Sequence, residues 1–300
     1  PYTTLFRSEL AEIKRDVQAL WKNAEDLSER NRKRRALESE ASVFLGDGPV
    51  GVSFISDQHI EEDGLSDLKT MRMDAELIRD TPGLYALLGG DGVNNHIKHR
   101  GAILASKSRP DNEWLMYDHY LNILNEKLLG VTSGNHDLWT LEFGGVDMVK
   151  RLAESKRLFY APHQMYIDVR VGKQVYKIAM RHQYRYNSSF NQIHAVHRWY
   201  DMGEVPFDIG VICHHHEACI GQFSRHGRQV WGARPGSYQL TSNYAEVYGY
   251  NRSTPTCPTF ILHGDEHRIV GYEDVRTGSA MLSALLSAKT PAKKATRRAN

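Results

Sequence analysis

The chain has 300 residues, of which 41% are hydrophobic, and its formal net charge is +2 at pH 7. This length is sufficient for one large domain with a substantial core and smaller appendages. The small net charge excludes a global field that would demand a nucleic acid partner, although basic residues cluster at 30–35 and 293–298. We expect both clusters to be solvated helix ends and tail residues.

The cysteines and the apolar runs bear on the cellular compartment. Cys213, Cys219 and Cys257 are an odd number with no spacing typical of a disulfide framework, which favours a reducing compartment. The sequence contains no apolar run long enough to cross a bilayer and does not open with a secretory signal. We therefore expect a cytoplasmic protein that does not associate with membranes.

The first segments of the chain are predicted to lie outside the main domain. Residues 1–8 begin with proline and resemble the in-frame translation of a sequencing adapter, so we expect an artefact there. Residues 9–45 are predicted to be an N-terminal helical extension, which could be an arm, a bundle remnant or the end of an upstream domain. Its apolar residues recur at three- and four-residue spacing, namely Leu10, Ile13, Val17, Leu20 and Trp21.

From residue 46 onward, short β-rich runs alternate with helical segments. The predicted strands are 50–55, 84–88 and 128–132, and the predicted helices are 66–79, 112–127 and 146–155. Ser66 is the expected N-cap of the first of these helices. Such alternation predicts an α/β layered domain whose strand-end loops meet at the carboxyl edge of a sheet.

The second half of the sequence has the pattern of a more antiparallel sheet. Paired β-rich runs are predicted at 165–171 with 174–180, at 218–223 with 229–233, and at 259–263 with 267–272, together with a single strand at 207–213 and a helix at 191–200. The main domain is predicted to span 46–276, followed by a C-terminal helix and a basic, disordered tail at 277–300. The expected fold class is α/β, with two packed mixed β-sheets flanked by helices.

Five short motifs follow the predicted strands. In chain order they are Asp57-x-His59, Gly90-Asp91-x-x-Asn94, Gly134-Asn135-His136-Asp137, His182 and His214-x-His216. Carboxylate, imidazole and amide groups without thiolates suit divalent ions such as Mn, Fe or Zn, and they argue against a closed structural zinc site. We expect Asp57 and His59 to face one side of an extended strand, and likewise His214 and His216.

Taken singly, each motif has an ordinary structural explanation. Asp91 follows two glycines and could be a turn or N-cap residue, although a carboxylate can also bridge two cations. His182 alone could be a core or surface histidine. Asp137 could orient or polarise His136, or serve only in the turn.

The order of the five motifs resembles the calcineurin-like metallophosphoesterases, over residues 50–274. The resemblance implies an α/β/β/α sandwich and two divalent ions, with Mn²⁺ preferred and Fe, Zn or Ni as alternatives, whose bridging hydroxide attacks a phosphoester. It implies that the first ion is held by Asp57, His59, Asp91 and His216. It implies that the second ion is held by Asp91, Asn135, His182 and His214.

The resemblance also assigns roles near the reacting phosphate. His136 would contact the phosphate and protonate the leaving oxygen, and Asn94 would orient His136. Two positions depart from the family pattern. Cys213 stands where glycine is usual, and we expect the site to persist with tighter packing. Asn94 replaces a carboxylate found in many relatives, so the protonated form of His136 should be less favoured and the pH optimum more acidic.

These residues predict a hydrolase, and a phosphodiesterase acting on DNA, RNA or nucleotide diesters is the leading hypothesis. It is favoured by His136, by the basic flanks and by the arginines, tyrosines and asparagine around His182. The alternatives are a phosphomonoesterase acting on phosphoproteins or small metabolites and, ranked last, a non-catalytic subunit of a replication or repair assembly. A looser resemblance to phosphoesterases of bacteriophages and their hosts suggests a nuclease in a bacterial or phage-infected cell.

Overall fold

The computed structural model describes residues 17–33, 39–98, 103–104, 106–188, 190–203, 205–240 and 256–289. The chain divides into two compact units, residues 1–40 and 41–300. The first unit contains a helix at 17–33, inside the predicted helical extension, and its Leu20 and Trp21 side chains are 66% and 67% exposed. The predicted adapter-derived segment and most of the predicted basic tail lie outside the described residues.

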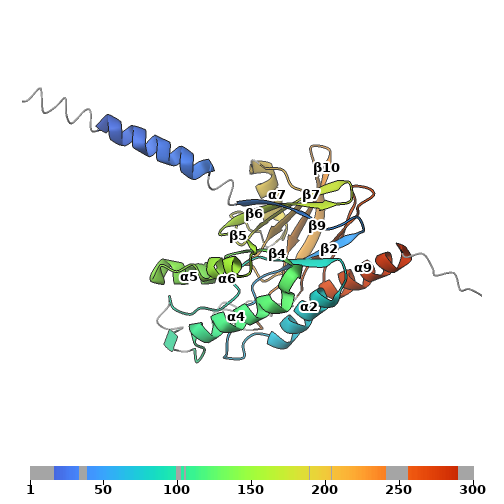
Figure 1. Ribbon diagram of the computed structural model, residues 1–300, viewed down its shortest axis with the longest axis horizontal. Coiled ribbons are helices and arrows are strands. Elements are labelled where there is room, and N and C mark those ends of the chain that lie inside the picture. Colours follow the sequence, from blue (N-terminus) through green and yellow to red (C-terminus); the bar gives the residue numbers. More distant parts are fainter. Residues whose placement is uncertain are drawn as a thin grey trace, which may run out of the picture. The chain divides into compact units, whose positions relative to one another are not determined.

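The second unit contains two six-stranded sheets (Figure 1). The sheet that carries the first three motifs has the strand order β12-β11-β2-β3-β4-β5. Its strands are β2 (Val50–Ile55), β3 (Leu84–Leu88), β4 (Leu128–Thr132), β5 (Phe159–Ala161), β11 (Thr259–Leu262) and β12 (Ile269–Tyr272). Strands β2 to β5 are parallel, and β11 pairs antiparallel with both β2 and β12. The parallel strands bring their carboxyl ends to one edge of the sheet.

The other sheet has the order β1-β6-β7-β8-β10-β9. Its strands are β1 (Glu40–Phe44), β6 (Gln164–Val171), β7 (Gln174–Arg181), β8 (Ile209–Ile212), β9 (Cys219–Arg225) and β10 (Arg228–Arg234). The pairs β6–β7 and β9–β10 are antiparallel, whereas β7–β8 and β8–β10 are parallel. Both sheets are therefore mixed, which confirms the predicted fold class.

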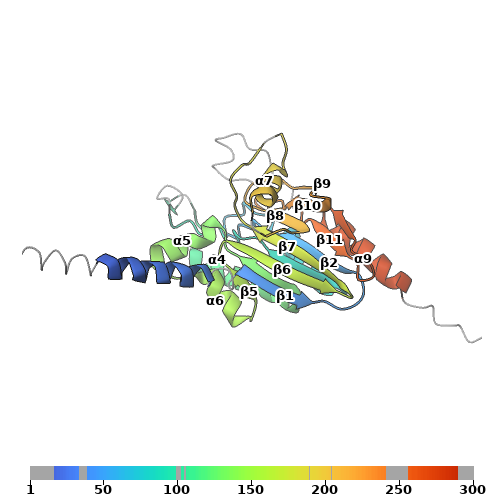
Figure 2. The ribbon, with the colours of Figure 1, turned by 90° about the horizontal axis from the view of Figure 1, so that it is seen from above.

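The second unit is layered (Figures 1 and 2), and its buried side chains identify which faces of the sheets meet. The helices are α2 (Leu68–Asp80), α4 (Pro110–Leu124), α5 (Asn135–Gly144), α6 (Met148–Ser155), α7 (His194–Met202) and α9 (Val275–Lys289), with a short 3-10 turn at Asn125–Lys127. Ile55 packs with residues of α2, α4, α6 and α9, whereas its neighbour Phe54 packs between the sheets. Likewise, Ile212 packs against α7 and Val211 between the sheets. Strand alternation thus places one sheet face against helices and the other face against the second sheet, in an α/β/β/α arrangement.

Three predicted boundaries are wrong in detail. Asp67, not Ser66, caps α2, because its carboxylate accepts from the Thr70 backbone N–H at 3.0 Å. Strand β1 lies within the segment predicted as helical extension, and its sheet pairing requires an extended backbone. Helix α9 belongs to the core rather than to an appendage, because Leu282 is fully buried in the helix–sheet cluster.

Two further observations concern the cysteines and the helices. All three cysteines are free thiols. Among the described residues, no helix combines the length and the apolar character needed to cross a bilayer.

Candidate metal centre

The turns that follow β2 and β3 are hydrogen-bonded to each other at the carboxyl edge of the sheet. The backbone N–H of Asp57 donates to Gly90 O at 2.9 Å, and that of His59 donates to Asp91 O at 3.0 Å. Because two short parallel strands fix both turns, the Asp57 and Asp91 carboxylates are held close together. Both side chains are buried, at 0% and 1% exposure.

Five of the predicted ligands have left-handed backbone conformations. The positive φ angles are 53° at Asp57, 46° at His59, 52° at Asp91, 74° at His214 and 60° at His216, and these make up half of the ten non-glycine residues described with positive φ. Such conformations are uncommon for residues with a side chain and cluster at functional sites. The expectation that each pair of ligands lies along an extended strand is therefore wrong. Strands β2 and β8 end at Ile55 and Ile212, and tight turns aim the side chains.

Two glycines allow the turns after β3 and β4 to touch. Gly90 has a φ of 93°, and a Cβ there would overlap the backbone of Gly134. A Cβ at Gly134 would in turn overlap the Asp91 carboxylate and backbone nitrogen. The site therefore needs glycine on both sides of this contact.

One group of ligands surrounds the Nε2 atom of His182. This atom lies 3.1 Å from Asp91 Oδ2, 3.1 Å from Asn135 Oδ1 and 3.2 Å from His214 Nδ1. Ligand atoms of Asp57, Asp91, His182 and His214 all lie within 4.8 Å of one another. The residues expected to hold the second ion thus lie together, with Asp57 beside them.

A second group contains Asp57, His59 and His216, again within 4.8 Å of one another. His216 Nε2 lies 3.2 Å from His59 Nε2 and 3.4 Å from Asp57 Oδ1. Asp91 Oδ2 lies 4.0 Å from His59 Nε2, so this carboxylate adjoins one imidazole of each group. Asp57, rather than Asp91, is the carboxylate that belongs to both groups, a proximity that the sequence did not indicate.

Hydrogen bonds at the far side of two rings orient their Nε2 atoms toward the site. His182 Nδ1–H donates to Gly89 O at 2.8 Å, and His59 Nδ1–H donates to Asn94 Oδ1 at 2.9 Å. When such a ring is neutral, as a metal ligand must be, its remaining Nε2 atom presents a lone pair to the other ligand atoms. Converging lone pairs of imidazole, carboxylate and amide repel one another unless a cation lies among them. The donor set therefore fits divalent metal ions.

The electrostatics of the site differ among its histidines: burial and neighbouring imidazoles lower the pKa of His59 to about 3 and also lower that of His214, whereas two other histidines are shifted upward. Burial disfavours the charged imidazole of His182, yet the Asp91 carboxylate raises its pKa to about 10. Burial likewise opposes charge on His216, but the hydrogen bond and charge of Asp57 raise its pKa. Despite burial, the histidines hold the pKa values of Asp57 and Asp91 well below their usual range. The two buried carboxylates thus keep their negative charge, which attracts a metal cation.

His136 lies at the first turn of α5, beside the two ligand groups. Its Nδ1–H donates to the backbone oxygen of Asn94 at 2.6 Å. The centre of its ring lies 4.1 Å from the ring centre of Trp139 and 4.8 Å from that of His59. The side chain is only partly buried. Since Nδ1 is engaged, Nε2 is the ring nitrogen that remains for a substrate oxygen.

Asn94 contacts two histidines through two different atoms. Its backbone oxygen, not its side chain, orients His136. Its side-chain oxygen accepts from His59 and from Gln239 Nε2 at 3.3 Å. A carboxylate at position 94 would therefore face His59, and the expectation that it would act directly on His136 is wrong.

Asp137 holds the strand-end turns. Its carboxylate accepts backbone N–H groups of Asp91 at 2.8 Å, Gly92 at 3.1 Å and Gly134 at 2.8 Å. Burial and the charge of Asp91 raise its pKa to about 7, against the donors that lower it. These contacts favour the turn role over the predicted catalytic role.

Two contacts near the ligands were not expected from the sequence. Gln183 Nε2 lies 2.7 Å from His214 Nε2, and its only sequence signal is that it follows the ligand His182. Gly89 supplies the carbonyl that orients His182, and a Cβ there would overlap the Cys213 sulfur. The departure at Cys213 is accommodated because the facing residue is glycine, which agrees with tighter packing at an otherwise complete site.

Comparisons with known proteins give similar folds at low sequence identity. No protein-family model matches the sequence, and no curated protein matches it. The crystal structure of TT1561 of Thermus thermophilus is similar with a TM-score of 0.42 and 12% identity, over 76% of this chain and 99% of that one. A metallophosphoesterase from Sphaerobacter thermophilus gives a TM-score of 0.36 and 12% identity, over 80% and 99%. The sulfate thiohydrolase SoxB of Thermus thermophilus gives 0.39 and 13%, over 80% and 60%. What this chain does is therefore inferred from its own side chains.

Proposed function

We propose that the chain is a metallophosphoesterase that uses two divalent cations and hydrolyses phosphodiesters of nucleic acids or nucleotides. The observation that carries this proposal is the convergence of imidazole, carboxylate and amide ligand atoms around His182 and His59, with His136 beside them. Buried polar side chains and left-handed backbone conformations both cost free energy. A purely structural role would not require such residues to converge on one place.

The ligands are proposed to divide as follows. One ion would be held by Asp57, His59, Asp91 and His216, and the other by Asp91, Asn135, His182 and His214. Bound divalent ions supply charge that activates water and neutralises phosphoryl oxygens during in-line attack. We propose Mn²⁺ as the ion, because the carboxylate and amide oxygens suit it, and the imidazoles keep Fe, Zn and Ni as alternatives.

The chain itself contributes orientation and a proton. Asn94 O fixes the His136 ring through Nδ1, and packing against Trp139 limits its rotation. His136 Nε2 is thereby aimed at a substrate oxygen, to which it can donate a proton as the phosphoester bond breaks. An alkoxide is a poor leaving group, so a positioned acid matters most for unactivated esters.

Support for a diester comes from what adjoins the site. The His214 side chain also lines a pocket whose other walls include arginine and tyrosine side chains, which leaves room for a substituent on the second ester oxygen. A monoester needs no such room, so a phosphomonoesterase is the second candidate.

The test is turnover of purified protein with Mn²⁺ on three substrates. Hydrolysis of bis-p-nitrophenyl phosphate and of single-stranded DNA, with weaker hydrolysis of p-nitrophenyl phosphate, is expected. Hydrolysis of p-nitrophenyl phosphate alone would indicate the monoesterase. Bound metal without turnover of any substrate would contradict both and favour a non-catalytic subunit.

A further inference from the structure

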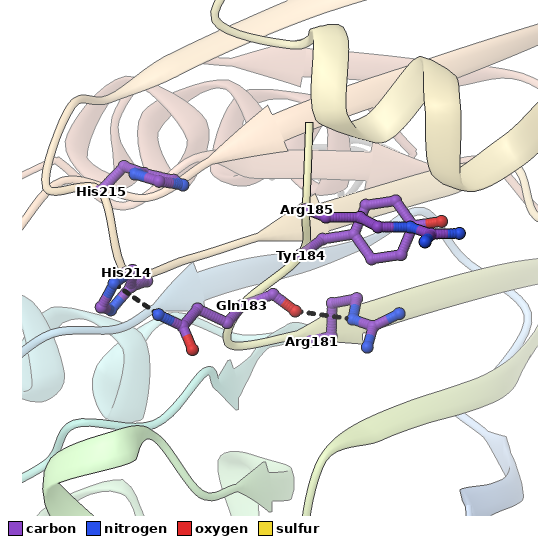
Figure 3. A pocket seen from close by; sticks show the side chains of 6 residues that line it. All are labelled: Arg181, Gln183, Tyr184, Arg185, His214 and His215. Carbon is purple, nitrogen blue, oxygen red and sulfur yellow. Dashed lines mark hydrogen bonds between the residues drawn. The ribbon is translucent and has the colours of Figure 1, made fainter. Parts of the chain in front are cut away.

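A pocket of about 660 Å³ opens next to the metal centre, with His214 in its wall. It is lined by Arg181, Gln183, Tyr184, Arg185, His214 and His215 (Figure 3). None of these six side chains is acidic, and two carry a permanent positive charge. Of these six residues, only His214 is an expected metal ligand, so the presence of the other five calls for a separate explanation.

The pocket is tied to the metal centre by two hydrogen bonds between loops. We name residues 182–188, which follow β7, the aromatic loop. Its Gln183 side chain meets His214 Nε2 at 2.7 Å, and its Asn187 Nδ2 lies 3.3 Å from His215 Nδ1. Buried Arg234 donates through Nη1 to Asn187 Oδ1 at 3.2 Å, which fixes how the amide is turned. The aromatic loop and the turn after β8, which carries His214 and His215, are thus held in one arrangement.

Arg181 forms the fixed wall of the pocket. Its Nε donates to Gln183 O at 2.8 Å (Figure 3), and its guanidinium carbon lies 4.6 Å from the Tyr184 ring centre and 5.2 Å from that of Trp199. Stacking between two rings and a hydrogen bond leave Arg181 little freedom. It therefore holds Tyr184 in place beside the site.

Tyr186 carries a second layer of stacking. Arg185 lies 4.9 Å and Arg198 5.3 Å from its ring centre, and the ring remains 39% exposed. The backbone of Tyr186 has a φ of 72°, which is an outlier for a bulky residue. An aromatic side chain held in this conformation at the surface, beside two arginines, resembles a stacking platform more than a packing element.

We propose that this pocket binds the nucleotide that adjoins the scissile phosphodiester in a single-stranded nucleic acid. The base stacks on Tyr184, and the phosphate on its far side pairs with Arg185, which is exposed and contacts only the face of Tyr186 among the described interactions. Alternating aromatic and guanidinium groups beside a phosphate-cleaving centre match what single strands offer, namely base faces and phosphates at regular intervals. The inference rests on the proposed phosphodiesterase function and names its substrate.

The inference is tested by direct binding, without turnover. The full-length protein in EDTA is titrated against a fluorescein-labelled single-stranded oligodeoxynucleotide, and anisotropy is followed over a range of salt concentrations. Arg185→Gln is expected to lower the slope of log affinity against log salt by about 0.7, the value for one phosphate contact on a single strand. Tyr184→Leu is expected to weaken binding about tenfold, and Tyr184→Phe to preserve it, because stacking needs the ring and not the hydroxyl.

The matched control is Arg170→Gln. Arg170 is an exposed arginine near the end of β6, and β6 runs antiparallel to β7, so it lies at the opposite end of the sheet from Arg181. This variant removes the same charge and should have the same affinity and the same salt slope as the wild-type protein. Arg185 is a surface residue, so its replacement tests the pocket even if Tyr184→Leu fails to fold.

The outcomes separate the two proposals. Equal effects of Arg185→Gln and Arg170→Gln, or no binding of the oligonucleotide by wild-type protein, would overturn the inference. Turnover of bis-p-nitrophenyl phosphate by the same wild-type preparation with Mn²⁺ would then leave the phosphodiesterase function standing. Binding that depends on Arg185, together with no turnover of any phosphoester, would instead overturn the proposed function and retain the pocket as a single-strand site.

Discussion

The side-chain oxygen of Asn94 accepts a 2.9 Å hydrogen bond from His59 Nδ1. The backbone oxygen of the same residue accepts one of 2.6 Å from His136 Nδ1. One residue therefore orients an imidazole proposed to bind metal and another proposed to donate a proton. The two functions can be separated by mutation, because only one of them uses the side chain.

Asn94→Ala is expected to weaken metal binding by about tenfold to a hundredfold, the usual effect of removing a residue that orients a histidine ligand. The backbone contact with His136 persists in this variant. Isothermal titration calorimetry with Mn²⁺ measures the loss of affinity. Asn94→Asp, which retains an acceptor for His59 Nδ1–H, is the control and should bind Mn²⁺ at least as tightly as wild type. Wild-type affinity in Asn94→Ala would show that the contact does not support the site.

Replacing Asp91 and replacing His136 should have different consequences. Asp91→Ala removes a carboxylate that lies 3.1 Å from His182 and 4.0 Å from His59, so we expect loss of both ions and of activity. His136→Ala should retain the metal and lower kcat by about a hundredfold to ten-thousandfold, as for loss of a general acid. For both variants, metal content is measured by mass spectrometry and kcat is measured on a diester substrate. Equal metal loss in the two variants would contradict the division of roles.

The sequence was sufficient to predict the strands that carry the site. Short apolar runs ending in Asp, Asn or His identify β2, β3, β4 and β8 within a residue or two, because buried parallel strands have few alternatives. The order of the motifs then predicted that side chains more than a hundred residues apart in the sequence lie close together in the fold. His59 and His216, for example, are 3.2 Å apart at Nε2.

The sequence did not reveal how the side chains are aimed. Alternation along a strand predicted that Asp57 and His59 share a face, but both lie in left-handed turns beyond β2. Helix α5 was also missed, because its first residues form the Gly134 motif and were interpreted as a turn. Tertiary contacts decide both features, since Asp137 caps this helix while holding the turn after β3.

Glu113 on α4 should make stability depend on pH. Its side chain is 1% exposed, and burial raises its pKa above the usual value near 4.5, although hydrogen bonds from Ser108 and from Asn95 N–H oppose the shift. A raised pKa means that the native state binds the proton more tightly than the unfolded state. Stability contributed by Glu113 is therefore complete below pH 4.5 and falls as the pH rises through the native pKa.

Glu113→Gln mimics the protonated side chain at every pH. Its free energy of unfolding should match that of wild type near pH 4 and exceed it increasingly toward pH 7. Urea unfolding of both proteins across this range measures the difference. Glu126→Gln, at an exposed position just after α4, is the control. A difference that is constant with pH would show that Glu113 does not titrate as burial requires.

Gly134→Ala tests whether the contact between the two turns is needed for the site. The backbone there has a φ of −95°, which alanine adopts without strain, so the only penalty is the overlap of its Cβ with Asp91. We expect the free energy of unfolding to fall by about 1–3 kcal/mol, as for overpacking elsewhere, and Mn²⁺ binding to weaken because Asp91 is displaced. Gly144→Ala is the matched control. This glycine is the last residue of the helix that Gly134 precedes, a Cβ there meets nothing within 4 Å, and alanine should be neutral or stabilising. Thermal unfolding and Mn²⁺ titration of both variants decide the matter. If Gly134→Ala binds Mn²⁺ as well as Gly144→Ala does, the position of Asp91 does not depend on this close approach.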